Sequence, residues 1–388
     1  MPPTEPALHP PDFTTYNPQP QSPLFATLPP EIRTEIFTYA LSPFEDKSNL
    51  YERDTYWSRP GYSAPLKTAT ELLRACRRVY AECWFMPFAL AEHSFYLTSG
   101  ARAPARGAWA SNRRRLEGHL GLLHGVYAQR EEKVRMGDVR VFAQMYLLEP
   151  GTLLQNVFDT RGLCPKRVHL TLRYTDFWHW EMNERLRIGG DWVRRVRFPD
   201  SVRSFVVDFE SLERRKGEID ILVAAAVEKW VFKRKDGRVL AANRDDLETM
   251  KWTGSSMFER TRWIRDEVRP GELDYYVLTA TWKLQPPSPD TVPADGTDMN
   301  IRVPHTYQQP APPYLGRDTI NEDDMDEAGV DMDTPAEQAV HAIDQAAAVA
   351  AEEAAAVSRR RRRHHPLSSI INGVGASLED DDDVEGDD

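Results

Sequence analysis

Cysteine and long apolar runs are scarce in this 388-residue chain. Its three cysteines, Cys76, Cys83 and Cys164, are too few for a disulfide scaffold, and no Asn-x-Ser/Thr glycosylation sequence occurs. The longest aliphatic run spans residues 221–227, far short of the roughly 20 residues needed to cross a bilayer. The first 22 residues lack the basic start and apolar stretch of a signal peptide. We therefore expect no membrane span and a place in the nucleus or the cytoplasm.

The motifs that usually reveal an enzyme are also missing. There is no nucleophile elbow, phosphate loop, dinucleotide fingerprint or His-Glu-x-x-His sequence. Asp324 and Gly329 fit a calcium loop, but Pro335 stands where that loop requires a bidentate glutamate. His119 and His124 have no cysteine pair nearby, so we interpret them as ordinary histidines and not as zinc ligands. The sequence predicts a protein that is not an enzyme, with no catalytic residue, metal site or cofactor.

Charge is distributed unevenly along the chain, whose formal net charge is −11. Residues 286–388 hold 23 acidic and 7 basic residues, a net of −16, which leaves the preceding part at +5. This last segment is rich first in proline and then in acid, and it has too little apolar surface to offset the entropy of ordering. We expect residues 286–388 to be a disordered acidic tail. Within it, alanine-rich residues 336–357 favour a helix that forms transiently or on binding.

The globular part opens with an amphipathic helix over residues 28–41. Pro29 and Pro30 suit the first turn of a helix, where missing amide donors cost little. Ile32 and Ile36 follow at helical spacing, while Phe37 and Leu41 form a second apolar stripe. Two stripes allow the helix to contact both its own core and a partner. The alternative is an ordinary amphipathic helix packed only on the core.

The remaining pattern predicts an α+β fold. Residues 42–67 form a long loop, and a second helix follows with a capping-box spacing of Thr68 and Glu71. We expect further helices over residues 116–130, 139–148 and 212–232, and strands over residues 94–99, 166–174, 201–210 and 274–284. This gives N-terminal helices packed with a helical middle region and a small, mostly antiparallel sheet. The expected divisions are a disordered N-terminus over residues 1–22, a helical region over 23–98, an α+β region over 99–285 and the tail over 286–388.

Two segments of the helical region resemble the F-box-like domain proteins found in fungi. The segments are LPPEIRTEIFTYAL at residues 28–41 and LLRACRRVYAE at residues 72–82. In that family a Leu-Pro-x-Glu-Ile-Arg helix precedes a Leu-Leu-x-x-Cys-Arg helix. The matching positions are Leu28, Pro29, Glu31, Ile32, Arg33, Ile36, Tyr39, Leu41, Leu72, Leu73, Cys76, Arg77, Tyr80, Glu82 and Phe95. This sequence departs from the compact F-box unit in the long loop at 42–67.

The resemblance implies that the first helix docks a Skp-type adaptor, which would tie the chain to a cullin ubiquitin ligase as a non-catalytic, substrate-recognising subunit. The expected docking residues are Leu28, Pro29, Ile32, Ile36, Phe37 and Leu41. The α+β region would then select an unknown protein substrate. The alternative within the same family is a nuclear scaffold that does not bind the adaptor. An enzyme of unrecognised class is the third hypothesis.

A run of basic residues lies near the end of the chain. Clustered arginines fit the acidic groove of an importin, so the run predicts nuclear import, with a solvated charge block as the alternative. The residues are Arg359, Arg360, Arg361, Arg362 and Arg363. Acidic neighbours and the lack of interleaved aromatic residues make nucleic acid an improbable partner. The acidic residues that follow favour solubility or contact with basic proteins.

Overall fold

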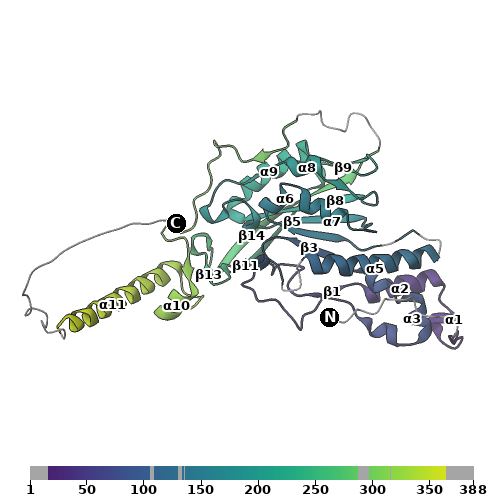
Figure 1. Cartoon of the computed structure of the whole chain (residues 1–388), viewed down its shortest axis with the longest axis horizontal. Coiled ribbons are helices and arrows are strands. Elements are labelled where there is room, and N and C mark those ends of the chain that lie inside the picture. The colour runs from purple at the N-terminus through teal and green to yellow at the C-terminus, as the bar shows by residue number, and fades with distance from the viewer. Residues whose placement is uncertain are drawn as a thin grey trace, which may run out of the picture.

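The computed structural model describes residues 16–104, 109–129, 133–134, 136–286, 297–314 and 316–363. A large curved sheet occupies the centre, with one group of helices above it, a second group below it, and the long C-terminal helix projecting to one side (Figure 1). No helix in the described ranges is long and apolar enough to span a bilayer.

Nine strands form the central sheet, in the order β3-β4-β5-β8-β14-β10-β9-β7, with β11 also paired to β14. The pairs β3–β4, β4–β5, β5–β8 and β7–β9 are parallel, and the pairs that involve β14 or β10 are antiparallel. The strands are β3 (His93–Leu97), β4 (Val139–Ala143), β5 (Arg167–Leu172), β7 (Arg197–Phe198), β8 (Ser204–Leu212), β9 (Val231–Arg234), β10 (Val239–Ala242), β11 (Glu248–Ser255) and β14 (Glu272–Leu284). The expectation of a small, mostly antiparallel sheet is therefore wrong, because half of this larger sheet is parallel.

One face of the sheet is covered by helices that follow or connect its strands (Figure 1). They are α6 (Met145–Leu148), α7 (Thr152–Phe158), α8 (Asp191–Arg195) and α9 (Lys216–Lys229). The predicted helix over residues 212–232 is confirmed by α9. Between helices and sheet lies the largest apolar core, where Trp192, Trp230 and Trp282 are fully buried. Burial on this scale supplies the main driving force for folding.

The predicted helix over residues 139–148 is wrong. Residues 139–143 form the strand β4, and only residues 145–148 are helical. Both neighbours of β4 are parallel to it, and Val139, Val141, Phe142 and Ala143 are all buried. A strand that is buried on both faces loses the alternation of polar and apolar residues by which strands are recognised, so its sequence resembles that of a buried helix.

The N-terminal helices have a core of their own. They are α1 (Pro23–Ala26), α2 (Pro30–Leu41), the 3-10 helix η1 (Thr70–Arg74), α3 (Arg77–Cys83), α4 (Met86–Leu90) and α5 (Trp109–Gln129). Phe37 and Leu41 of α2 share this core with Leu123 and Val126 of α5. The expected second helix is broken: it starts as η1, and α3 is capped by Cys76, whose Sγ accepts from the Val79 N–H at 3.4 Å. No helix starts at Thr68, so the proposed capping box is wrong.

The segment after residue 296 is folded against the body over much of its length. Ile301 begins β15 (Ile301–Arg302), which pairs with β6 (Arg187–Ile188), and β16 (Ile320–Asn321) extends a small sheet with β12 (Met257–Phe258) and β13 (Thr261–Arg262). The helices α10 (Glu322–Ala328) and α11 (Ala336–Arg363) follow, and Ile320, Met325 and Ile343 join a third buried cluster. The expectation of disorder from residue 286 onwards is wrong for residues 299–343, because their few apolar side chains pack on surfaces that the body already provides. The alanine-rich helix is confirmed within α11, and residues 364–388 lie outside the described residues.

Candidate functional site

The helix α2 presents two different faces, as its two apolar stripes predicted. Phe37 and Leu41 are 2% and 0% exposed and belong to the helical core. On the opposite side Ile32, Ile36 and Tyr39 are 42%, 41% and 77% exposed. Their spacing of four and three residues places them on one side of the helix. We call Ile32, Ile36 and Tyr39 the α2 stripe.

The six expected docking residues are therefore divided by the fold. Ile32 and Ile36 lie in the α2 stripe, and Pro29 is exposed at the start of the helix while Leu28 is half-buried. The remaining two, Phe37 and Leu41, are core residues of the free chain. Tyr39 is the most exposed apolar residue of α2; it matches the family pattern but was not among the six expected docking residues.

A partly buried ion pair joins α2 to α3. The Arg33 guanidinium donates through Nε to Glu82 Oε2 at 2.9 Å and through Nη2 to Glu82 Oε1 at 3.1 Å. Its Nη1 donates to the Leu28 carbonyl at 2.8 Å, so one side chain fixes both the turn that precedes α2 and the neighbouring helix. Bidentate arginine–carboxylate pairs are geometrically specific. The two segments that carry the family resemblance are thus bonded directly to each other.

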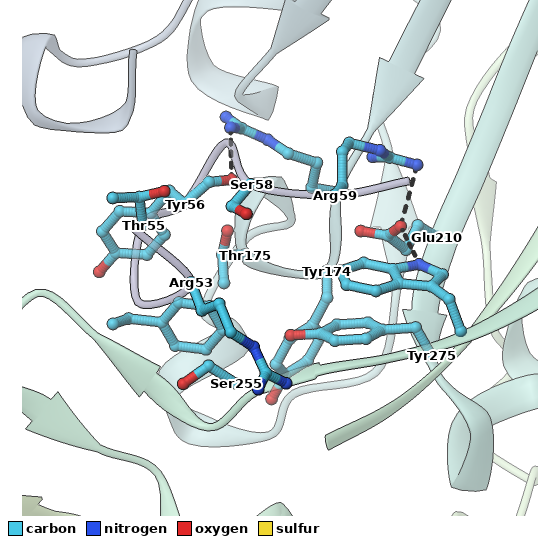
Figure 2. Close-up of a pocket in the computed structure, with 13 residues that line it drawn as sticks. Arg53, Thr55, Tyr56, Ser58, Arg59, Tyr174, Thr175, Glu210, Ser255 and Tyr275 are labelled. Atoms are coloured by element: carbon cyan, nitrogen blue, oxygen red, sulfur yellow. Dashed lines mark hydrogen bonds and ion pairs between the residues drawn. The ribbon is translucent and has the colours of Figure 1, made fainter. Parts of the chain in front are cut away.

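The loop between these helices is an ordered arm that reaches the sheet. We call residues 42–67 the insert; it carries the two-residue strands β1 (Phe44–Glu45) and β2 (Leu66–Lys67), which pair with each other. From the insert, Arg59 Nη2 lies 3.0 Å from Glu210 Oε2, and both side chains are less than 5% exposed. Trp252 Nε1 donates to the same oxygen at 2.9 Å (Figure 2). The insert is therefore part of the fold.

A small polar cavity lies beneath the insert (Figure 2). Arginines, hydroxyl-bearing side chains and aromatic rings line it, among them Arg53, Ser58, Thr175 and Trp252, and its volume is about 30 Å³. That space holds a few water molecules at most, which is too little for a substrate. Burial raises the pKa of the Glu210 carboxyl above its ordinary value, although the neighbouring Arg59 opposes the shift.

His169 and Asp208 form the arrangement that most resembles a catalytic pair. His169 Nε2 lies 2.7 Å from Asp208 Oδ2. Burial alone would raise the pKa of Asp208, but the adjacent His169 imidazole and a hydrogen bond from Thr279 bring it below its ordinary value. The hydroxyls of Thr171 and Thr279 donate to Asp208 and not to His169, so the histidine activates neither of them as a nucleophile.

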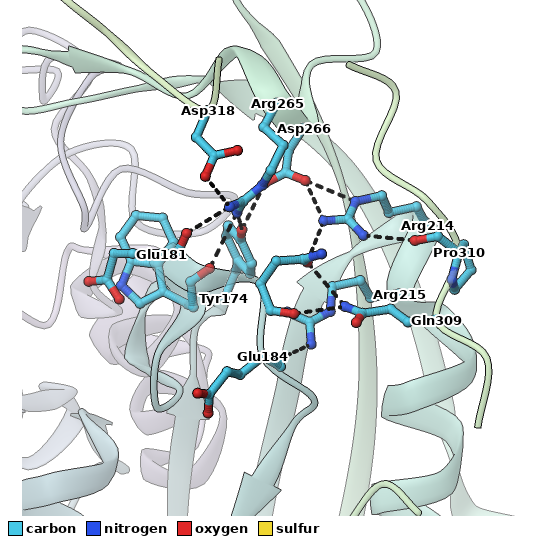
Figure 3. Close-up of polar contacts among 12 residues, drawn as sticks. Tyr174, Glu181, Glu184, Arg214, Arg215, Arg265, Asp266, Gln309, Pro310 and Asp318 are labelled. Carbon is cyan, nitrogen blue, oxygen red and sulfur yellow. Dashed lines mark hydrogen bonds and ion pairs between the residues drawn. The ribbon is translucent and has the colours of Figure 1, made fainter. Parts of the chain in front are cut away.

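A second polar cluster fastens the C-terminal segment to the body (Figure 3). Asp266 accepts from Arg214 Nε at 2.9 Å, from Arg265 Nη2 at 2.9 Å and from the Tyr174 hydroxyl at 3.0 Å. Arg214 Nη1 also donates to the Pro310 carbonyl at 3.3 Å. Buried polar groups that are all hydrogen-bonded stabilise one arrangement of the chain.

Among the described residues, no group of three or more His, Cys, Asp or Glu side chains is placed to hold a metal ion.

The predicted import run lies at the exposed end of α11. Arg359 and Arg360 are exposed, and the helix that carries them projects from the body (Figure 1). The side chains of Arg361, Arg362 and Arg363 lie outside the described residues.

Comparison of the chain with family models, with curated proteins and with solved structures found no match.

Proposed function

We propose that this chain is a non-catalytic protein-interaction subunit, in which the α2 stripe docks a Skp-type adaptor of a cullin ubiquitin ligase. The observation that carries the proposal is the exposure of Ile32, Ile36 and Tyr39 on a helix whose other face is packed into a core. An exposed apolar side of an amphipathic helix is suited to a groove on a partner. The resemblance of residues 28–41 and 72–82 to F-box-like proteins indicates which partner.

A few apolar side chains of α2 would contribute most of the free energy of binding to the adaptor. Covering the exposed surface that remains on Ile32 or Ile36 would contribute about 1–2 kcal/mol each, by the usual value per area of apolar surface. Tyr39 adds an aromatic ring, a residue type enriched in the centres of interfaces. Phe37 and Leu41 would support the helix from behind and would not touch the adaptor. The α+β region would then hold the protein substrate.

A pull-down with a purified Skp-type adaptor tests this proposal. The full chain should retain the adaptor, and Ile36→Asp should lower its recovery at least about tenfold, because a charged group would replace a buried anchor. Thr34→Asp is the matched control, since Thr34 is also a β-branched, exposed residue of α2 but lies on another side of the helix. Equal recovery of wild type and Ile36→Asp, with both folded by circular dichroism, would show that the α2 stripe is not the docking site.

The second candidate function is a nuclear scaffold that does not bind the adaptor. The exposed position of Arg359 and Arg360 at the end of α11 favours it, because an import receptor must reach those side chains. Nuclear fluorescence of the tagged full chain that disappears when residues 359–363 are changed to glutamine, together with no adaptor in the immunoprecipitate, would select the scaffold. Nuclear import accompanied by adaptor binding would instead keep the first proposal.

A further inference from the structure

A basic hollow lies at the edge of the central sheet, where β5 and β8 begin and β14 ends. Its volume is about 640 Å³, within the range of sites that hold small molecules. Six of its lining residues are basic and one is acidic. They are Lys133, Lys166, Arg203, Arg234, Arg238 and Lys283, with Asp200 as the acid. Positive charge therefore predominates in the lining of the hollow.

Neighbouring acids neutralise the hollow only in part. Arg234 and Arg238 are both paired with Asp236, and Lys283 Nζ lies 2.9 Å from Asp246 Oδ2. Lys166 and Arg203 are exposed and make no ion pair with any residue in the described ranges. Like charges held close together repel one another, so they favour the binding of an anion between them.

The backbone that carries these cations is fixed by hydrogen bonds between neighbouring strands. The Arg203 N–H donates to the Lys166 carbonyl at 2.8 Å, and the Leu284 N–H donates to the Arg203 carbonyl at 2.9 Å. Arg234 Nη1 donates to the Val202 carbonyl at 2.9 Å. The backbone positions that carry the cations are therefore fixed before any ligand arrives, which reduces the entropy lost on binding.

One further polar group in the hollow lacks a protein partner. The Oγ of Ser201 is buried, and among the described residues it makes no hydrogen bond. A buried hydroxyl without a partner costs free energy, and a bound anion would accept its hydrogen bond. Ser201 follows Asp200 in the chain and precedes Arg203 by two residues, and all three line the same hollow.

We propose that the basic hollow binds a compact small molecule that carries several phosphate groups. Guanidinium and ammonium groups are the usual partners of phosphate oxygens, and arginine can bind them through two parallel hydrogen bonds. The described lining contains no aromatic ring, so nucleobases would have no surface on which to stack. The concave shape and ligand-sized volume favour a compact polyanion over an extended chain. This site is independent of adaptor docking by α2.

Inorganic tripolyphosphate is a suitable probe for the full chain. Isothermal titration should show one binding site at about 50 mM salt, with affinity at least tenfold weaker at about 300 mM salt because the interaction is between charges. Lys166→Glu combined with Arg203→Glu should weaken binding at least about tenfold. The matched control is Arg74→Glu combined with Arg77→Glu, which changes the net charge equally at two exposed basic residues that do not line the hollow. The control should bind like wild type.

Three outcomes would overturn the proposal. They are the absence of tripolyphosphate binding by wild type at low salt, equal weakening in the hollow and control variants, and binding of a synthetic peptide of residues 379–388 where tripolyphosphate does not bind. The last outcome would assign the hollow to acidic polypeptide, because that segment holds eight acidic residues in ten. Both double variants change exposed side chains, so a circular dichroism spectrum like that of wild type is expected and serves as the folding check.

Discussion

Replacing Arg59 with methionine removes the buried cation that joins the insert to the sheet. In the wild type Arg59 and Glu210 pair at 3.0 Å with side chains 4% and 3% exposed, and Trp252 donates to the same carboxylate. Methionine retains much of the length and apolar surface of arginine but cannot neutralise Glu210. Removing one partner of a buried ion pair typically costs about 3–5 kcal/mol, because it leaves an uncompensated charge in the interior. We expect that loss for Arg59→Met near neutral pH.

The expected loss depends on pH in a definite direction. Burial raises the pKa of Glu210 in the folded chain above its value in the unfolded chain, and Arg59 opposes that shift. In Arg59→Met the pKa should therefore rise further. A carboxyl with a raised folded-state pKa binds its proton more tightly in the folded state, so stability falls as the pH rises through that range. Protonation at low pH removes the buried charge, and the cost of Arg59→Met should be smaller at about pH 5 than at about pH 8.

Urea unfolding of the full chain followed by tryptophan fluorescence measures both effects, with the free energy taken by linear extrapolation. A second variant, Glu210→Gln, and the double variant complete a thermodynamic cycle. The double variant should be more stable than Arg59→Met alone, since no unpaired buried charge remains. A cost below about 1 kcal/mol for Arg59→Met, or a cost that does not change with pH, would refute the view that this pair holds the insert against the sheet.

Two further predictions concern packing. Leu41→Ala should destabilise the chain by about 2–5 kcal/mol, because Leu41 is fully buried, whereas Tyr39→Ala on the exposed side of the same helix should cost no more than about 0.5 kcal/mol in urea unfolding. Gly190→Ala should destabilise the chain and speed proteolysis of the segment after residue 296, because a Cβ there would lie 2.2 Å from the Met299 carbonyl carbon. Gly118→Ala, in an open position within α5, should instead stabilise by about 0.5–1 kcal/mol. Leu41→Ala as mild as Tyr39→Ala, or Gly190→Ala as stable as wild type, would contradict the packing described.

Local pattern was sufficient for elements with a clear helical period and for runs of β-branched and aromatic residues. It predicted α2 with its two stripes, α9, and the strands near residues 168, 205 and 278. It did not distinguish β4 from a helix, because β4 is paired with a strand on each edge and is buried on both faces. Strand order and parallel pairing depend on contacts between distant segments, which local periodicity does not contain.

The same limit applied to the candidate site and to the C-terminal segment. Exposure of Ile36 and burial of Phe37 depend on which side of α2 meets α5, and both residues have the same apolar character in the sequence. The pairing of Arg59 with Glu210 joins a loop to a distant strand. From the sequence alone, each of these charged residues would be expected on the surface. Composition correctly described residues 299–343 as too polar to form a core of their own. It did not reveal that a few of their apolar side chains complete the core of the body.

Two ion pairs of the N-terminal region hold α2 and the insert in place. Arg33 bonds the helix to Glu82 and to the carbonyl of Leu28, which fixes the start of α2. Beyond its end, Arg59 ties the insert to Glu210 in the sheet. Because α2 is bonded at its start and packed along one face, substitution at Ile36 should change what the helix can bind without releasing the helix itself. Ile36→Asp therefore tests docking separately from folding, as Leu41→Ala tests folding separately from docking.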